Sequence, residues 1–512
     1  MEVTSASVLN SLIVGVLLLF GLYFLSWIFR RSPKNVPPGP REWGTNWKIL
    51  KASWNGTLPK LASEWALKYK DITFVYSFGL QLVFLNSAEI TRKLLTSNKY
   101  KFLVADRSPN AAARIIELNG KDLVFSKFDG KFNIKRRLFY SVIGLYGDGV
   151  AKFEDMVWRE IERMFMEIDV REGKDTDLSS ILTRSLKIIL YILVRGEGPI
   201  DPKEPEILEE YDMAVNKLAQ ADVDFVLDNL PFLTQIPGKF KRAVTHVKEA
   251  KKQADELLFY GPKRTHKPGE PRGITDLLLD FARQPGYEWM KTDEQHIIAF
   301  LTSLVVAGNL TTRSSLTGIF LCLVNYPEVI RTIQGEIDNV IGSERPKLEH
   351  RSKMPYTEAT ILEGLRLISP VPLNAFRRAS EDIDFEGMVI PKNALILINS
   401  WHFLHDENKW EDPWAFNPKR FLDDQGNLLP IDHPRRKDLI AFGVGARACP
   451  GEMFSRSRMF LFITSILQRY DLLPPANESL TSADFNIHSE NVLGLVRQTP
   501  PFKCRLVRRQ RH

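Results

Sequence analysis

The longest uninterrupted apolar stretch of the chain lies close to its amino terminus. Residues 8–29 read VLNSLIVGVLLLFGLYFLSWIF and carry no charge. About 20 such residues are enough to cross a bilayer core of roughly 30 Å as a helix. The stretch is longer than the apolar region of a cleaved signal peptide, which has about 7–15 residues, and no small-x-small cleavage site follows it. We therefore expect an uncleaved, single-pass membrane anchor over residues 1–30.

The charges that flank this stretch predict its orientation. Glu2 precedes it, whereas the basic residues Arg30, Arg31 and Lys34 follow it. By the positive-inside rule, everything after residue 30 then faces the cytosol.

Beyond the anchor, the pattern changes to short periodic segments. Residues 31–45 are basic and rich in proline, so we expect a stiff hinge there. Residues 71–86 (DITFVYSFGLQLVFLN) alternate and are rich in β-forming residues, which predicts a hairpin. Most of the remainder has a helical period, interrupted by a loop rich in proline, glycine and charge at 261–273. No internal repeat divides the chain, so we expect a mainly α fold with small β-sheets, formed by one large domain over residues 46–512.

One predicted helix is far longer than the others. It should begin near residues 292–295 (TDEQ), which have the capping-box pattern, and end near Asn325. Such a helix has about 30 residues and a length of some 50 Å. Residues 297–306 are apolar on all sides, but a polar segment at 308–312 interrupts them before membrane length is reached. A helix through the middle of a core is therefore favoured over a second membrane span.

Composition narrows the function. The net charge is +7 and the pI is near 9.0, but part of the excess lies in the tail arginines, which we expect to be solvated: Arg505, Arg508, Arg509 and Arg511. No basic stripe is interleaved with aromatic residues, so nucleic acid is not an expected partner. Three cysteines are too few for a disulfide framework, which agrees with a domain in the reducing cytosol.

The densest chemical pattern lies at residues 442–451, which read FGVGARACPG and precede an apolar helical stretch at 459–467. Its glycines let the backbone pass close to a flat ligand, and its arginine can pair with an anion. A helix that starts just after Cys449 would stabilise a thiolate there. Two other interpretations are a dinucleotide fingerprint, which lacks its βαβ context, and a buried structural cysteine. The complete ten-residue pattern argues against both.

This segment resembles the haem-binding loop of cytochromes P450, whose pattern is F-x-x-G-x-R-x-C-x-G. The resemblance implies haem b as the cofactor and Cys449 as the axial thiolate ligand of its iron, within a loop bounded by Phe442 and Gly451. It also implies that Arg447 pairs with a haem propionate.

Two more arginines fall at propionate-binding positions of the family. Arg377 lies in the segment VPLNAFRRA, and Arg136 lies in Phe132-x-x-x-Arg136. The family pattern has Trp at position 132. Phe132 can pack on the ring edge but has no N–H to donate, and the resemblance implies Arg136 as a propionate ligand.

The resemblance covers nearly the whole chain and extends to a structural network. Glu363 and Arg366 match the E-x-x-R helix motif of the family, and Arg420 matches its P-x-R-F segment. These three residues are implied to form a buried charge network behind the haem. The chain is most similar to animal microsomal enzymes, in the group that includes steroid 17-hydroxylases and aryl-hydrocarbon hydroxylases.

The chain departs from the family on the distal side of the haem. Most members read A-G-x-D/E-T-T in the long helix, where the acid and the first threonine relay protons. Here the catalytic candidates Gly308, Thr311 and Thr312 are present, but Leu310 replaces the acid. Leu310 can neither carry nor orient a proton. Asn309 is about 100° away around the helix and is no obvious substitute.

The resemblance implies an endoplasmic reticulum enzyme with its catalytic domain in the cytosol. The leading hypothesis is a monooxygenase that inserts one oxygen atom into a lipophilic substrate, with electrons from NADPH through NADPH-cytochrome P450 reductase. The missing acid leaves two alternatives: a haem-thiolate isomerase, dehydratase or peroxide-using enzyme, and a haem-binding protein that has lost catalysis. Membrane lipid and a steroid, other lipid or xenobiotic substrate are the remaining expected partners.

Overall fold

The computed structural model describes Gly21, residues 34–476 and residues 495–510, apart from 43, 78, 108–109, 145–148, 200, 202 and 220. The predicted anchor, except for Gly21, and residues 31–33 of the predicted hinge lie outside the described residues.

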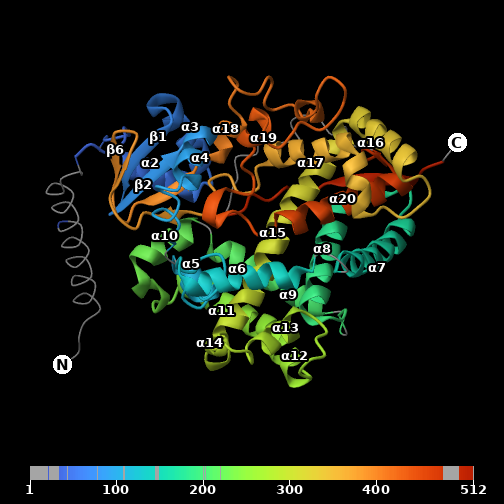
Figure 1. The fold of residues 1–512 in the computed structure, drawn as a ribbon, viewed down its shortest axis with the longest axis horizontal. Helices are drawn as coiled ribbons and strands as arrows, with labels where there is room; N and C mark the ends of the chain where they lie inside the picture. Colours follow the sequence, from blue (N-terminus) through green and yellow to red (C-terminus); the bar gives the residue numbers. More distant parts are fainter. Residues whose placement is uncertain are drawn as a thin grey trace.

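The long helix α15 (Gln295–Asn325) passes through the middle of the molecule (Figure 1). It packs against α8 (Leu178–Arg195), α17 (Pro355–Ile368) and α20 (Glu452–Arg469). Among the described helices it is the one long and apolar enough to cross a membrane, but 72% of its most apolar window is buried inside the protein. The prediction of a core helix is confirmed.

The start of α15 differs from its prediction. Thr292 is the last residue of the short helix α14 (Glu288–Thr292), and its hydroxyl donates to the Glu288 carbonyl. The N-cap of α15 is Glu294, two residues later, whose side chain makes no capping hydrogen bond. Asp293 takes part of that role, because its Oδ1 accepts the Gln295 N–H at 3.3 Å. The predicted capping box is wrong because α14 extends to Thr292 and α15 begins only at Gln295.

Three small sheets accompany the helices. The predicted hairpin is confirmed as antiparallel β1 (Ile72–Ser77) and β2 (Leu80–Leu85). Strand β7 (Leu395–Ile398) continues this sheet parallel to β2, and β4 (Arg377–Arg378) closes it in the order β1-β2-β7-β4. Figure 1 shows this sheet beside the amino-terminal helices, apart from the helices around α15. The remaining strands are β3 (Asp175–Asp177), β5 (Ile383–Phe385), β6 (Met388–Ile390), β8 (Tyr470–Leu473) and β9 (Lys503–Arg508).

The carboxyl-terminal arginines are more ordered than expected. Strand β9 lies between β3 and β8. Arg508 pairs with Asp169 at 2.9 Å, and Arg509 pairs with Asp338 at 2.7 Å. The backbone up to Arg508 is thus part of a sheet and the Arg509 side chain is only 14% exposed, whereas the Arg508 side chain stays 53% exposed, in agreement with the predicted solvation.

The predicted loop at 261–273 also begins later than expected, since its first residues continue the preceding helices as α12 (Gly261–Arg264). The other α-helices are α2 (Thr45–Trp54), α3 (Leu58–Tyr69), α4 (Ala88–Thr96), α5 (Ala111–Ile116), α6 (Gly130–Ile143), α7 (Gly149–Asp169), α9 (Glu204–Leu218), α10 (Ala221–Asn229), α11 (Lys239–Asp255), α13 (Ile274–Phe281), α16 (Pro327–Val340), α18 (Ser400–Leu404) and α19 (Pro434–Asp438).

Candidate active site

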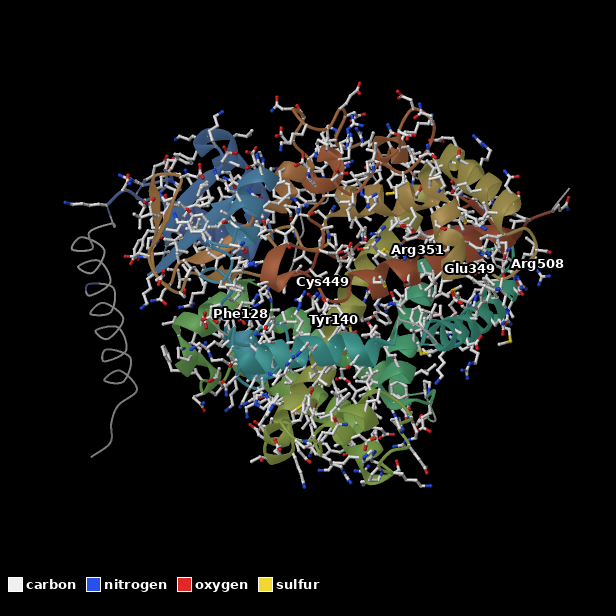
Figure 2. The ribbon with its side chains drawn as sticks, in the orientation of Figure 1. Phe128, Tyr140, Glu349, Arg351, Cys449 and Arg508 are labelled. Atoms are coloured by element: carbon white, nitrogen blue, oxygen red, sulfur yellow. The ribbon has the colours of Figure 1, made fainter. Side chains whose placement is uncertain are left out.

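A cavity of about 580 Å³ lies beside the middle of α15. Most of its lining side chains are apolar, such as Phe139 from α6, Val215 from α9 and Phe300 from α15. Cys449 reaches the same cavity from the loop before α20, and Figure 2 shows it near the centre of the molecule. A largely apolar cavity of this size with a few polar groups is typical of small-molecule sites.

The loop around Cys449 is held tightly by its backbone. The Cys449 N–H donates to the Phe442 carbonyl at 2.8 Å. Gly445 has a φ of +74°, and a Cβ there would stand 2.0 Å from the Leu95 carbonyl oxygen. Glycine is therefore required by both conformation and space. Phe442 and Gly451 also line the cavity, and a Cβ on Gly451 would stand 3.8 Å from the Cys449 Sγ.

Cys449 is the cysteine that faces this cavity. Cys322 and Cys504 are buried in α15 and β9 and do not line it. Burial raises the pKa of Cys449 to about 11, although the Gly451 N–H, Arg136 and Arg107 act in the opposite direction. The Gly451 N–H, at the start of α20, thus acts in the predicted direction, but its effect on the pKa is smaller than that of burial. A metal ion can supply the missing charge, because a coordinating thiol is deprotonated outright.

Four arginines from distant parts of the chain line one end of the cavity: Arg107, Arg136, Arg377 and Arg447. Burial, together with the charge of Arg107, lowers the pKa of Arg377 and of Arg447 to about 9. Within the described part of the chain, no carboxylate forms an ion pair with any of the four. Because buried charges need partners, this cluster of arginines requires an anion that the described residues do not provide.

The hydrogen bonds of these arginines leave donors free. Arg377 donates from Nη2 to the Val444 carbonyl at 2.7 Å, but its Nε and Nη1 have no partner. Arg447 donates to the carbonyls of Ala105 and Ser126, and its Nη1 is unpartnered. These unpartnered donors next to a cavity with a free thiol fit the two carboxylates of a haem.

Arg136 is held differently from the other predicted ligands. Its Nη1 donates to the Ala448 carbonyl at 2.8 Å, and its Nη2 donates to the Tyr140 hydroxyl at 3.0 Å. Two of its nitrogens are thus engaged with protein, one of them on the cysteine loop. Phe132 packs its ring 3.8 Å from the Arg447 guanidinium carbon, so it supports that arginine rather than donating a hydrogen bond.

Sequence reasoning missed Arg107. It is partly buried, lines the cavity and has an unpartnered Nε, and desolvation lowers its pKa to about 10. Arg107 lies in an irregular segment with no periodic pattern. Only its position beside Arg377 and Arg447 in the folded chain identifies it.

The predicted distal residues lie along the face of α15 that borders the cavity. The Thr311 hydroxyl donates to the Ala307 carbonyl at 2.9 Å, and Leu310 lines the cavity with no polar atom. Gly308 allows α8 to approach, because a Cβ there would stand 3.2 Å from a methyl carbon of Leu190. Asn309 faces away and donates to Asp212 at 2.6 Å. Among the residues that the structure describes, no acid therefore stands beside Thr311 on this face.

Thr312 is bound to α20 rather than free in the cavity. Its hydroxyl lies 2.9 Å from the Ser455 hydroxyl and also accepts from Arg458 Nη2 at 2.9 Å. Arg458 was not among the residues identified from the sequence.

The structure brings the predicted charge network together. Glu363 accepts from Nε and Nη2 of Arg366, both at 2.8 Å, and from Nε of Arg420 at 3.3 Å. Glu363 and Arg366 are fully buried.

Comparisons with known proteins agree over most of the chain. The cytochrome P450 family model matches residues 37–505. The chain is 27% identical over 490 residues to cytochrome P450 2D10 of Rattus norvegicus, covering 94% of each chain. It is 29% identical over 439 residues to the steroid 17-alpha-hydroxylase/17,20 lyase of Gallus gallus, covering 83% of this chain and 82% of that one. A solved zebra fish cytochrome P450 with progesterone superposes with a TM-score of 0.73 at 25% identity, covering 88% of this chain and 99% of that one.

The match of the family model extends well beyond the cysteine loop and includes all four arginines, the long helix and the buried charge network. Haem, the cofactor of this family, explains both the thiol of Cys449 that faces the cavity and the absence of a protein anion beside the arginines. The chain belongs to the cytochrome P450 family of haem-thiolate monooxygenases, and Cys449 is the ligand of its iron.

Proposed function

We propose that this protein inserts one oxygen atom from dioxygen into a lipophilic substrate, using electrons that NADPH supplies through NADPH-cytochrome P450 reductase. The observation that carries the proposal is the apolar cavity, which Thr311 and Cys449 both line. Haem bound there supplies dioxygen activation, which electron donation from the thiolate favours. Small lipids, including steroids, and apolar xenobiotics are the substrate classes that such a cavity accommodates.

Each residue of the site has a distinct task in this proposal. Arg107, Arg377 and Arg447 hold the propionates through their unpartnered donors, and Arg136 secures the cysteine loop at Ala448. The Thr311 hydroxyl donates to Ala307 and can turn toward a ligand in the cavity. Because Leu310 carries no proton, protons must reach this position through ordered water or through a substrate hydroxyl.

The same proposal places the protein at the endoplasmic reticulum membrane, with residues 1–30 as the anchor and the body in the cytosol. Exposed apolar side chains support contact with a lipid surface: Trp47 and Trp54 on α2, and Phe232 and Ile236 after α10. Lys239 lies 4.7 Å from the Trp54 ring, so the two exposed segments are close together. Grouped exposed apolar residues are typical of membrane or protein contacts.

The test supplies purified protein with NADPH, the reductase, isotopically labelled dioxygen and a panel of lipids chosen by binding spectra. We expect one labelled oxygen atom in the product and consumption of NADPH. Conversion without label or without dioxygen would refute the proposal.

A second candidate function is favoured by one observation, namely the apolar Leu310 where the family has its acid. A haem-thiolate isomerase or dehydratase, or an enzyme that uses a peroxide, activates no dioxygen and does not need that acid. Conversion of a lipid hydroperoxide in the absence of NADPH and reductase would identify this class.

A further inference from the structure

We propose that Arg458 is a positioning residue that ties the distal helix to the helix after Cys449, and that its uncompensated charge raises the reduction potential of the haem iron. This inference concerns the resting protein. It rests on haem binding and holds whether the reaction is an oxygen insertion or an isomerisation.

The contacts of Arg458 join the two sides of the haem site. The residue lies on α20, and its Nη2 donates to the Gly308 carbonyl at 2.8 Å and to the Thr312 hydroxyl at 2.9 Å. Ser455, one turn earlier on α20, lies 2.9 Å from the same hydroxyl. The Phe454 ring lies 4.1 Å from the guanidinium carbon. Arg458 thus holds α15 at the segment that borders the cavity.

The charge of Arg458 has no counterpart among the described residues. It is fully buried, no carboxylate pairs with it, and its Nε and Nη1 have no partner. Burial lowers its pKa to about 9, so it is still a cation at neutral pH. Arg456, two residues earlier, is bound instead by Glu358 at 2.7 Å and by Glu452 at 3.4 Å.

The other charged groups near this part of α15, which come from α8, α9 and α15 itself, are already paired. Asp212, which accepts from Asn309, lies 3.7 Å from Lys187. Arg313 lies 3.4 Å from Glu209. With Leu310 in place of an acid, Arg458 is the charged side chain that donates to the Gly308–Thr312 segment without a carboxylate partner in the described structure.

An unpaired cation in a low-dielectric site stabilises the reduced form of a neighbouring redox group, because that form carries one more negative charge. Arg458 lines the same cavity as Cys449. It lies six residues after the first residue of α20, which corresponds to about 9 Å of helix. Reduction of the iron adds one negative charge to the haem, so the cation stabilises the reduced form.

The experiment measures the midpoint potential of the haem by spectroelectrochemistry on substrate-free holoprotein. Arg458→Gln can keep hydrogen bonds but removes the charge, whereas Arg458→Lys keeps the charge when the potentials are measured at about pH 6, because burial lowers the pKa of a lysine at this position as well. We expect Arg458→Gln to shift the potential to more negative values. The ratio of ferrous to ferric haem at a fixed solution potential should fall on the order of tenfold, the effect of one charge at about 10 Å in a medium of dielectric constant about 20. Arg458→Lys should stay near the wild-type value.

Two controls separate charge from packing. Arg456→Gln removes a paired cation from the same helix, and Ser455→Ala loosens the hydroxyl cluster without changing its charge; both should leave the potential unchanged. Equal potentials for Arg458→Gln and wild type would overturn the inference, as would an equal shift in Arg458→Lys. If Arg458→Gln binds no haem, a potential of Arg458→Lys far below that of Ser455→Ala would overturn it, and agreement between the two would support it. Because no substrate or dioxygen is present, the result is independent of the labelling test for the reaction.

Discussion

Removing the Glu363 carboxylate should destabilise the protein more than removing any exposed acid. In Glu363→Ala, the fully buried Arg366 guanidinium loses both of its 2.8 Å bonds to a carboxylate. It retains the carbonyls of Leu404 at 2.8 Å and Ala415 at 3.3 Å, neither of which carries a charge. The Asn417 N–H and Arg420 lose an acceptor as well.

The size of the effect follows from the stranded charge. Breaking a buried ion pair by removing one partner costs about 3–5 kcal/mol, because the remaining ion stays desolvated. Glu363 has two arginine partners and Arg420 is almost fully buried, so we expect a loss at the upper end of this range.

The assay is urea unfolding of the holoprotein, followed by tryptophan fluorescence and by haem absorbance. Glu349→Ala is the matched control, because Glu349 is an exposed acid with one ion pair, to Lys347 at 3.5 Å (Figure 2). The double variant Glu363→Leu with Arg366→Met replaces charges by apolar groups and should recover part of the stability. A Glu363→Ala protein as stable as Glu349→Ala would show that the buried network does not hold this part of the core.

Three further outcomes follow from the site and its surroundings. Gly445→Ala forces a Cβ to 2.0 Å from the Leu95 carbonyl oxygen and should sharply reduce the amount of haem bound per protein. The control Gly426→Ala, at a φ of +83° in open space, should cost about 1 kcal/mol of stability and leave the haem content unchanged. Equal haem content in the two variants would contradict this prediction. Leu310→Asp should increase the product formed per NADPH consumed if dioxygen is activated, and a decrease would support the second candidate function. Burial raises the pKa of Asp224 to about 7, and the charge of Asp228 acts in the same direction, although hydrogen bonds from the Ala112 N–H and Asn110 and the charge of Arg114 oppose both. The folded protein thus binds a proton there that the unfolded chain has lost above about pH 4, so the stability of wild type relative to Asp224→Asn should fall as the pH rises from about 5 to about 8. A constant difference across this range would show that Asp224 is ionised throughout.

The features that could be predicted from the sequence are those encoded within a few consecutive residues. The loop at 442–451 places its glycines, Arg447 and Cys449 in one short segment, so the pattern identifies them together. The core helix was predicted because residues 297–306 are apolar on every face. Local patterns of this kind persist when the chain folds.

The features that were missed or wrong depend on distant neighbours. Arg458 owes its role to Gly308 and Thr312, which precede it by 150 and 146 residues. Thr292 matches a capping box, but a neighbouring helix holds it. The tail arginines join a sheet whose other strands come from elsewhere in the chain. Tertiary contacts decide all three, and no short window of sequence contains them.

The wide separation of the four arginines along the chain has a consequence for biosynthesis. Arg107 is made 342 residues before Cys449, which at roughly 5–20 residues per second corresponds to about 20–70 s. During that interval the arginine cluster has neither its counter-anion nor its iron ligand. Haem capture is therefore a late step, and a nascent chain that stalls before residue 449 exposes an incomplete apolar pocket to chaperones and proteases.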